Sequence, residues 1–344
     1  MALRDHEAAA SDTARTPDRG RELRRRAAGE PGPRRIVLAA AVAALACVVP
    51  ALTGSAPATA QADGPPGARA GRAPLIVAHR AGTADFPENT LLALTASLKA
   101  GVDGEWLSVQ ASKDGVPVLY RPADLSALTD GSGPVAGRTL ADLAGLNAGY
   151  GFKGPDGSYP YRARPLRIPT LEEALEAVPM GKQIYLDLKQ APARHVVDAV
   201  VRLLDAKQAW GRVKLYSTDA EVTTLLSRIP AAQVAESRDA TRQRLAEVAL
   251  EQTCKSTPRA GSWAGFELKR PMTLQEKFTL GTGEAAVTAQ LWTRASVACF
   301  RSRSARTPIV MLGVNTPADL RTATRLGATA VVVDSPRTLL PAHR

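Results

Sequence analysis

From residue 75 onward, short apolar runs alternate with segments of helical periodicity. Eight of these runs predict strands, at 75–79, 104–109, 116–120, 183–188, 213–217, 233–237, 308–314 and 328–334. Strands that alternate with helices predict a parallel sheet, and eight of them fit an α/β fold with a closed (β/α)8 barrel of the TIM type. An open doubly wound sheet is the alternative, but no GxGxxG motif follows the first strand.

The clearest helical pattern is "NTLLALTASLKAG", which directly follows the first strand and its loop. Leu91, Leu94 and Leu98 form one apolar stripe at helical spacing. Asn89 is the predicted N-cap, and Gly101 is the predicted residue just beyond the last turn.

The segment before the first strand has the pattern of an export signal. Residues 36–53 are apolar and uncharged, Arg34 and Arg35 stand directly before them, and small residues, Ala58 and Ala60, follow. A positive flank, an apolar run and an A-x-A site are typical of a signal peptide. An uncleaved membrane anchor is the alternative, because the apolar run has the minimum length of a membrane span.

This pattern divides the chain into three parts. The divisions are a basic leader with a signal peptide or anchor at 1–62, a Pro/Gly-rich linker at 63–74 and the barrel at 75–344. Both interpretations of the leader predict an exported protein, either secreted or membrane-anchored and extracellular.

The net charge of +11 favours an acidic partner. The partner could be a phosphate, an anionic lipid surface or a polyanionic wall polymer. The alternative is that the charge only reflects a compositional bias toward arginine and has no functional meaning. No nucleic-acid-binding motif accompanies the charge, so a nucleic-acid partner is not expected. None of the three cysteines has a metal-binding spacing. Cys254 and Cys299 could form a disulfide in an oxidising compartment or remain two free thiols.

Polar residues gather where the predicted strands end. In a barrel of this kind the catalytic groups lie at the C-terminal ends of the strands. The residues at these ends are His79, Arg80, Asp187, Lys189, Ser217, Asp219, Asn315 and Asp334. Guanidinium and ammonium groups bind phosphate well, so Arg80 and Lys189 together predict an anion between them.

A series of motifs over about residues 75–340 resembles the glycerophosphodiester phosphodiesterase family. The matching segments, in the order of the family, are "HRAGTADFPENTLLAL", "SKDGVPV", "LTDGSGPV", "RTLADLAGLNAG", "IPTLEEAL", "DLK", "GVNTPADL" and "GATAVVVDSP". The resemblance implies a phosphodiesterase-like barrel that cleaves deacylated phospholipids to glycerol 3-phosphate and an alcohol. It also implies two acid/base histidines and a divalent cation, Ca²⁺ or Mg²⁺, held by three carboxylates.

When the family's site residues are carried over to this sequence one by one, one half of the site matches the family pattern. His79 falls on the first catalytic histidine, Arg80 on the phosphate-contacting arginine and Glu88 on the glutamate of the PENT motif. The resemblance therefore implies that His79 and Arg80 are catalytic, with Arg80 at the substrate phosphate, and that Glu88 helps to bind the substrate.

The other half of the site departs from the family pattern. Trp106 and Ser108 fall on the first two carboxylate ligands, Asp187 on the third, and Arg121 on the second histidine. Asp187 is a residual metal ligand and Ser108 a poor one, because hard cations prefer six or more oxygen ligands, largely from carboxylates and water. Glu105 does not replace the ligand at 106 unless a β-bulge shifts the register, because successive side chains of a strand point to opposite faces.

The missing histidine reduces the acid/base capacity of the site. Loss of one general acid or base typically lowers the rate by ~10²–10⁴. Arg121 cannot exchange a proton near neutral pH, although it can hold a phosphate oxygen. Glu267, in "GFELKR", offers a replacement carboxylate if it reaches the mouth of the barrel, and otherwise a local salt bridge.

Three functions remain open. In the first, His79, Arg80, Arg121 and Lys189 bind a phosphodiester or phosphate head group with weak or no hydrolysis, and Trp106 closes part of the pocket. The second is an active phosphodiesterase with a rebuilt, metal-independent site in which cations stabilise the transition state. The third is a non-enzymatic extracellular interaction module that uses the barrel as a scaffold.

Overall fold

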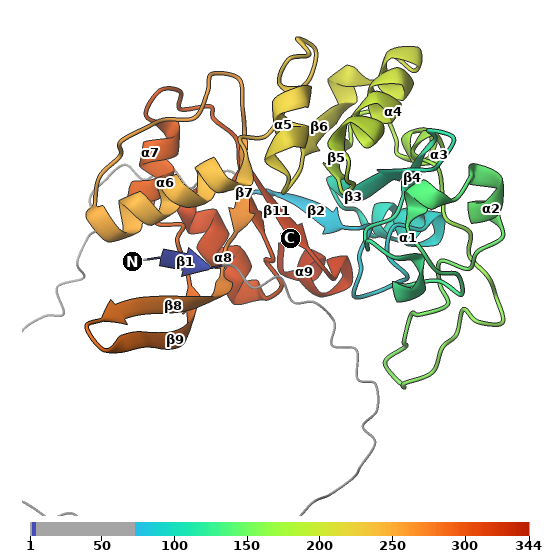
Figure 1. The fold of residues 1–344 in the computed structure, drawn as a ribbon, viewed down its shortest axis with the longest axis horizontal. Coiled ribbons are helices and arrows are strands. Elements are labelled where there is room, and N and C mark those ends of the chain that lie inside the picture. The colour runs from blue at the N-terminus through green and yellow to red at the C-terminus, as the bar shows by residue number, and fades with distance from the viewer. Residues whose placement is uncertain (1, 5–72, 344) are drawn as a thin grey trace, which may run out of the picture. The chain divides into compact units, whose positions relative to one another are not determined.

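The computed structural model describes residues 2–4 and 73–343, which include a parallel sheet in the order β6-β5-β3-β2-β11-β10-β7 (Figure 1). The strands of this sheet are β2 (Leu75–His79), β3 (Gly104–Ala111), β5 (Gln183–Leu188), β6 (Val213–Tyr216), β7 (Ala264–Glu267), β10 (Ile309–Leu312) and β11 (Ala330–Val333). The first strand therefore lies between the second and the last, as the (β/α)8 barrel requires.

Residues 233–236 occupy the eighth strand position, between β6 and β7. Val234 forms a parallel bridge with Leu215 of β6, and Ala235 forms another with Trp263, the residue before β7. The amide of Glu236 donates to the carbonyl of Trp263 at 2.7 Å. These contacts join the two edges of the sheet and confirm the predicted barrel class.

One predicted barrel strand, 116–120, is wrong. Its residues form β4 (Pro117–Leu119), which pairs antiparallel with β3 through Val109 and Leu119. Parallel neighbours need a crossover of a dozen or more residues, and the tight turn between Ala111 and Pro117 leaves no room for one. The barrel strand that the prediction did not include is β7.

Helices cover the outer face of the sheet, with α1 to α4 on one flank and α6 to α8 on the other (Figure 1). Their bounds are α1 (Leu91–Ala100), α2 (Leu140–Ala144), α3 (Leu171–Ala177), α4 (Ala193–Ala206), α5 (Ala220–Leu226), α6 (Arg238–Glu251), α7 (Arg294–Arg301), α8 (Pro317–Leu326) and α9 (Pro336–His343). In the described ranges, no helix is long and apolar enough to cross a membrane. The predicted leader, 36–53, lies outside the described residues.

The N-terminus of α1 differs from the prediction. The N-cap is Thr90, whose hydroxyl accepts from the amide of Ala93, and not Asn89. Asn89 has a positive φ of 58°, and its side-chain oxygen accepts from the amide of Ser108 in β3. Gly101 ends the helix at φ 101°, as predicted, because glycine adopts this left-handed conformation without a steric penalty.

Two excursions extend the barrel. Residues 121–168, between β4 and α3, pack around a small apolar core with Leu125, Val135 and Leu143 at its centre. A long antiparallel hairpin, β8 (Arg270–Phe278) and β9 (Gly281–Ala289), follows β7 and projects away from the sheet (Figure 1). Strand β1 (Ala2–Arg4) pairs with β8.

Cys254 and Cys299 form a disulfide with a sequence separation of 45 residues. The bond joins the segment after α6 to helix α7, and Cys299 is buried. This settles the alternative that the sequence left open for the two cysteines.

Candidate functional site

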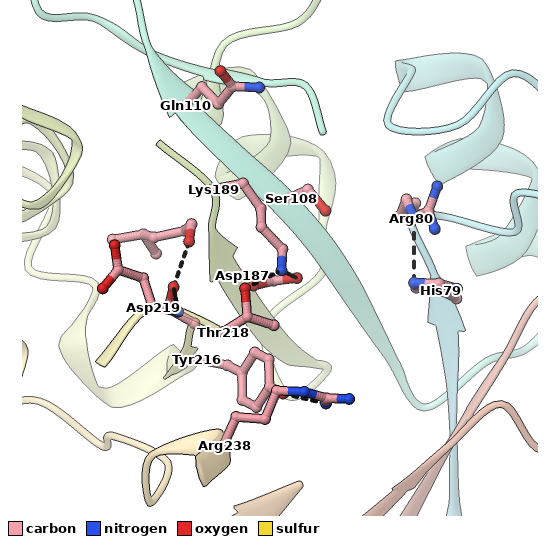
Figure 2. A network of polar contacts seen from close by, with 12 residues as sticks. His79, Arg80, Ser108, Gln110, Asp187, Lys189, Tyr216, Thr218, Asp219 and Arg238 are labelled. Carbon is pink, nitrogen blue, oxygen red and sulfur yellow. Dashed lines mark hydrogen bonds and ion pairs between the residues drawn. The ribbon is translucent and has the colours of Figure 1, made fainter. Parts of the chain in front are cut away.

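Register in the sheet brings the predicted site residues to the C-terminal mouth of the barrel. His79 of β2 lies opposite Trp106 of β3, and Ser108, two residues further along, lies opposite Asp187 of β5. Asp187 in turn lies opposite Tyr216 of β6. In Figure 2 the strand that carries Ser108 runs between Asp187 on one side and His79 on the other.

An aromatic cluster, formed by Trp106, Tyr185, Tyr216 and Trp263, fills the barrel interior below the mouth. The ring centroids of Trp106 and Tyr185 lie 5.7 Å apart with nearly parallel planes, and that of Tyr216 lies 5.0 Å from Trp106. Trp106 is 2 % exposed. Stacked and tilted aromatic pairs of this kind add to the stability gained from burial alone.

This packing bears on the divalent cation that the resemblance implies. The resemblance puts Trp106 at the position of the first carboxylate ligand, and its indole is an integral part of the aromatic cluster. Ser108, at the second position, is a neutral hydroxyl beside Asp187. Within residues 2–4 and 73–343, no group of three His, Cys, Asp or Glu residues could hold a metal ion. The described residues therefore do not fit a hard cation, which needs several oxygen ligands.

Glu105 points away from the mouth, as the alternation of a strand requires. It is fully buried against helix α1, where its Oε1 lies 2.6 Å from the hydroxyl of Ser97. Burial raises the pKa of Glu105 well above its usual range, although the Ser97 hydrogen bond and the charge of Lys182 act in the opposite direction.

We expect Glu105→Gln to make the stability of the protein less dependent on pH. The pKa is raised in the folded state, so the unfolded chain loses this proton first as the pH rises above its ordinary value of 4.5. The residue then destabilises the fold by up to about 1.4 kcal/mol per pH unit until its folded pKa is reached. Urea unfolding at about pH 5 and about pH 7 should show that the free energy of unfolding falls more between these pH values in the wild type than in Glu105→Gln. An equal fall in both proteins would contradict the assignment.

His79 and Arg80 are each held by a carboxylate. The Nδ1 atom of His79 lies 2.5 Å from Oδ1 of Asp334, and the Nε–H of Arg80 donates to Nε2 of His79 at 3.2 Å. Arg80 also forms an ion pair with Glu88, whose carboxylate accepts from Thr83 at 2.9 Å. Glu88 therefore fixes the guanidinium that the resemblance assigns to phosphate contact.

Lys189 and Asp187 form the second charged group of the mouth. The ammonium of Lys189 donates to the hydroxyl of Thr218 at 2.9 Å and lies 3.5 Å from Oδ2 of Asp187. Burial raises the pKa of Asp187, while the nearby charge of Lys189 opposes that shift. The pair is local, as the sequence allowed, yet both side chains face the mouth (Figure 2).

Arg121 begins the excursion that follows β4. The side-chain amide of Gln110, in β3, donates to the carbonyl oxygens of Tyr120 and Pro122 at 3.3 and 2.7 Å. These bonds hold the backbone of Arg121 beside the C-terminal end of β3. Its side chain is half-buried and makes no hydrogen bond or ion pair with the described part of the chain.

Glu267 reaches the mouth at the end of β7 but is already paired. Both of its carboxylate oxygens accept from the guanidinium of Arg238, at 2.7 and 2.9 Å. Arg270 contributes a further contact at 3.2 Å. Two arginines thus neutralise this carboxylate, and the salt bridge that the sequence offered as the alternative is the one found.

Three residues of the site were given no role by the sequence analysis. Asp334 and Asn315 were recognised as strand ends, but their pairing with His79 depends on barrel closure, which brings the first and last strands together. Arg238, which bonds Glu267 and the hydroxyl of Tyr216, follows the eighth-strand segment directly. Its position after a predicted strand is the signal that could have identified it.

Comparison with known proteins places this geometry in a family. Residues 79–338 match the model of the glycerophosphoryl diester phosphodiesterase family. The chain is 54 % identical over 264 residues to "Uncharacterized protein Rv2277c" of Mycobacterium tuberculosis, a match that covers 76 % of this chain and 87 % of that protein. A Bacillus subtilis glycerophosphodiester phosphodiesterase is 35 % identical over 119 residues, covering 33 % of this chain and 40 % of that protein.

Solved structures agree with the sequence comparison. The crystal structure of the glycerophosphoryl diester phosphodiesterase domain of the M. tuberculosis protein superimposes with a TM-score of 0.73 at 52 % identity, covering 79 % of this chain and 98 % of that chain. An Oleispira antarctica phosphodiesterase in complex with the product sn-glycerol-3-phosphate shares the fold, with a TM-score of 0.57 at 21 % identity over 78 % of this chain and 96 % of that chain. Because the family model matches residues 79–338, which are most of this chain, the chain belongs to the glycerophosphoryl diester phosphodiesterase family.

Proposed function

We propose that this protein binds the phosphate of a glycerophosphodiester head group at the mouth of the barrel, without a divalent cation and with weak or no hydrolysis. One observation carries the proposal. The mouth keeps two cations, Arg80 beside His79 and Lys189 beside Asp187, while Trp106 of the aromatic cluster occupies the position that the resemblance gives to the first metal ligand.

The two cations retain donors for a ligand. The guanidinium of Arg80 has five N–H donors, and its described contacts engage Nε with His79 and Nη1 with Glu88. Lys189 has three donors and contacts Thr218 and Asp187. Arg121 has no described polar partner and stands at the start of the neighbouring excursion. Arginine and lysine are the side chains that bind phosphate oxygens best.

A second candidate is slow hydrolysis without a metal. It is favoured by the contact between His79 and Asp334, because an imidazole held by a carboxylate can act in acid/base catalysis. Water would add to phosphorus, the bond to the alcohol oxygen would break, and a proton would pass from the water to the leaving oxygen. The cations would stabilise the charge that develops on the phosphoryl oxygens.

We also propose that the protein is exported. The segment 36–53 has the composition of a signal peptide. The disulfide between Cys254 and Cys299 supports an oxidising compartment, because such bonds are rare in the cytosol. The net charge of +11 suits anionic surroundings, including a membrane surface or a wall polymer.

Calorimetric titration with sn-glycerol 3-phosphate tests the head-group proposal. We expect binding that is equal in Ca²⁺ and in EDTA, and a loss of affinity of about 10- to 150-fold in Arg80→Ala, since a hydrogen bond to a charged group contributes about 1.5–3 kcal/mol. Arg228→Ala is the matched control, because Arg228 is exposed just beyond the C-terminal end of α5, at the opposite end of the barrel.

Two outcomes would overturn this proposal. The first is no binding in either medium, and the second is binding that requires Ca²⁺. Release of glycerol 3-phosphate from glycerophosphocholine, followed in the same samples with His79→Ala beside the wild type, separates head-group binding from the second candidate. Release that needs His79 and persists in EDTA would establish metal-independent hydrolysis.

A further inference from the structure

A chain of hydrogen bonds behind His79 remains after the phosphate contacts have been assigned. Asp334, just after β11, lies 2.5 Å from the imidazole Nδ1 through its Oδ1 atom. Its other oxygen, Oδ2, accepts from the side-chain amide of Asn315 at 2.6 Å. Asn315 lies in the loop after β10, and its own oxygen accepts from the backbone amide of Asp334 at 2.8 Å.

These contacts define which ring nitrogen of His79 carries the proton. A guanidinium can only donate, so the contact from Nε of Arg80 requires a lone pair on Nε2 of His79. An ionised carboxylate can only accept, so Nδ1 must donate to Asp334. Burial alone would raise the pKa of Asp334, but hydrogen bonds from His79 and Asn315 and the charge of Arg80 lower it. The carboxylate is therefore ionised at neutral pH.

Both ends of this chain are anchored. Asn315 fixes the Asp334 carboxylate through two bonds, one to the side chain and one to the backbone. At the other end Glu88 fixes Arg80, and Glu88 is itself held by Thr83. The imidazole thus has a fixed orientation between an acceptor behind it and a donor at the mouth.

We propose that Asp334, oriented by Asn315, is the positioning residue that holds His79 in the Nδ1–H tautomer, with the Nε2 lone pair directed to Arg80 and the mouth. A phosphate that competes for Arg80 would then meet a basic nitrogen and not an N–H group. The inference rests on the proposed function for the identity of that ligand. The tautomer itself follows from the contacts of the protein alone.

Imidazole ¹⁵N–¹H correlation spectra test this assignment, because the chain has four histidines and His79→Gln identifies the signal of interest. We expect a protonated Nδ1 and an unprotonated Nε2 in the wild type near neutral pH. Asp334→Asn, which keeps the shape of the side chain, should lose the Nδ1–H signal and shift the population toward the Nε2–H tautomer. Asn315→Ala should weaken the same signal.

Asp85→Asn is the matched control. Asp85 accepts from the hydroxyl of Ser335, the residue next to Asp334, but has no contact with His79. Its replacement should leave the His79 signal unchanged. An Nε2–H tautomer in the wild type, or a signal that survives Asp334→Asn in a normally folded protein, would overturn the inference.

Titration of these samples with sn-glycerol 3-phosphate separates the two proposals. A change at Nε2 of His79 that is absent in Arg80→Ala would support both. Retention of the Nδ1–H tautomer without any response to the ligand would count against head-group binding, while the assignment of Asp334 would stand.

Discussion

Replacement of Trp106 by alanine is expected to lower the free energy of unfolding by about 3–5 kcal/mol. The side chain is 2 % exposed and contacts three aromatic rings, those of Tyr185, Tyr216 and Trp263. Truncation removes the apolar area of the indole and leaves a cavity that stiff neighbouring rings cannot fill. Urea unfolding, followed by circular dichroism, measures the loss.

Trp106→Phe is the control, because it keeps one aromatic ring in the cluster and should cost less than the alanine substitution. A loss below about 1 kcal/mol in Trp106→Ala would contradict a structural role for the indole. Trp106→Glu would place a carboxylate among buried rings, which is costly without a partner. A metal site therefore cannot be regained by this single substitution.

Removal of the disulfide between Cys254 and Cys299 is expected to lower the free energy of unfolding by about 4 kcal/mol. The bond closes a loop with a sequence separation of 45 residues, and the chain-entropy model assigns about this value to a loop of that length. Urea unfolding of the Cys254→Ala, Cys299→Ala double variant beside the wild type measures the difference.

A reductant provides the matched comparison. It should lower the stability of the wild type toward that of the double variant and leave the double variant unchanged. Equal stability of the wild type in oxidising and reducing buffer would contradict the expected contribution. The bond ends at helix α7, which lies on the flank away from β3 (Figure 1), so binding of sn-glycerol 3-phosphate should be retained wherever the protein remains folded.

Hydrophobic periodicity predicted most of the barrel because its parallel strands are apolar on both faces. The error at 116–120 arose because β4 has the same apolar composition as a barrel strand. The short turn after Ala111 argued against a barrel strand, because it is too short for β4 to become a parallel neighbour of β3. Strand β7 was missed because two of its four residues, Ala264 and Gly265, are small and leave it without a clear apolar run.

Site residues at strand ends were predictable because the carboxyl ends of parallel strands meet at one edge. His79, Arg80, Asp187 and Lys189 were identified in this way. Pairings between distant segments were not predictable: His79 and Asp334 are 255 residues apart and meet through closure of the barrel. The partners of Trp106 come from three other segments, so sequence could place the indole but not show what surrounds it.

The bridged segment 233–236 gives the barrel a seam. The other neighbours share continuous ladders, whereas this segment is joined through single bridges at Val234 and Ala235. Few backbone hydrogen bonds mean a small free energy of local opening, so the ring of strands would part here before it parts elsewhere. The ion pair between Arg238 and Glu267 lies at the C-terminal end of this seam and links the segment 233–236 to β7.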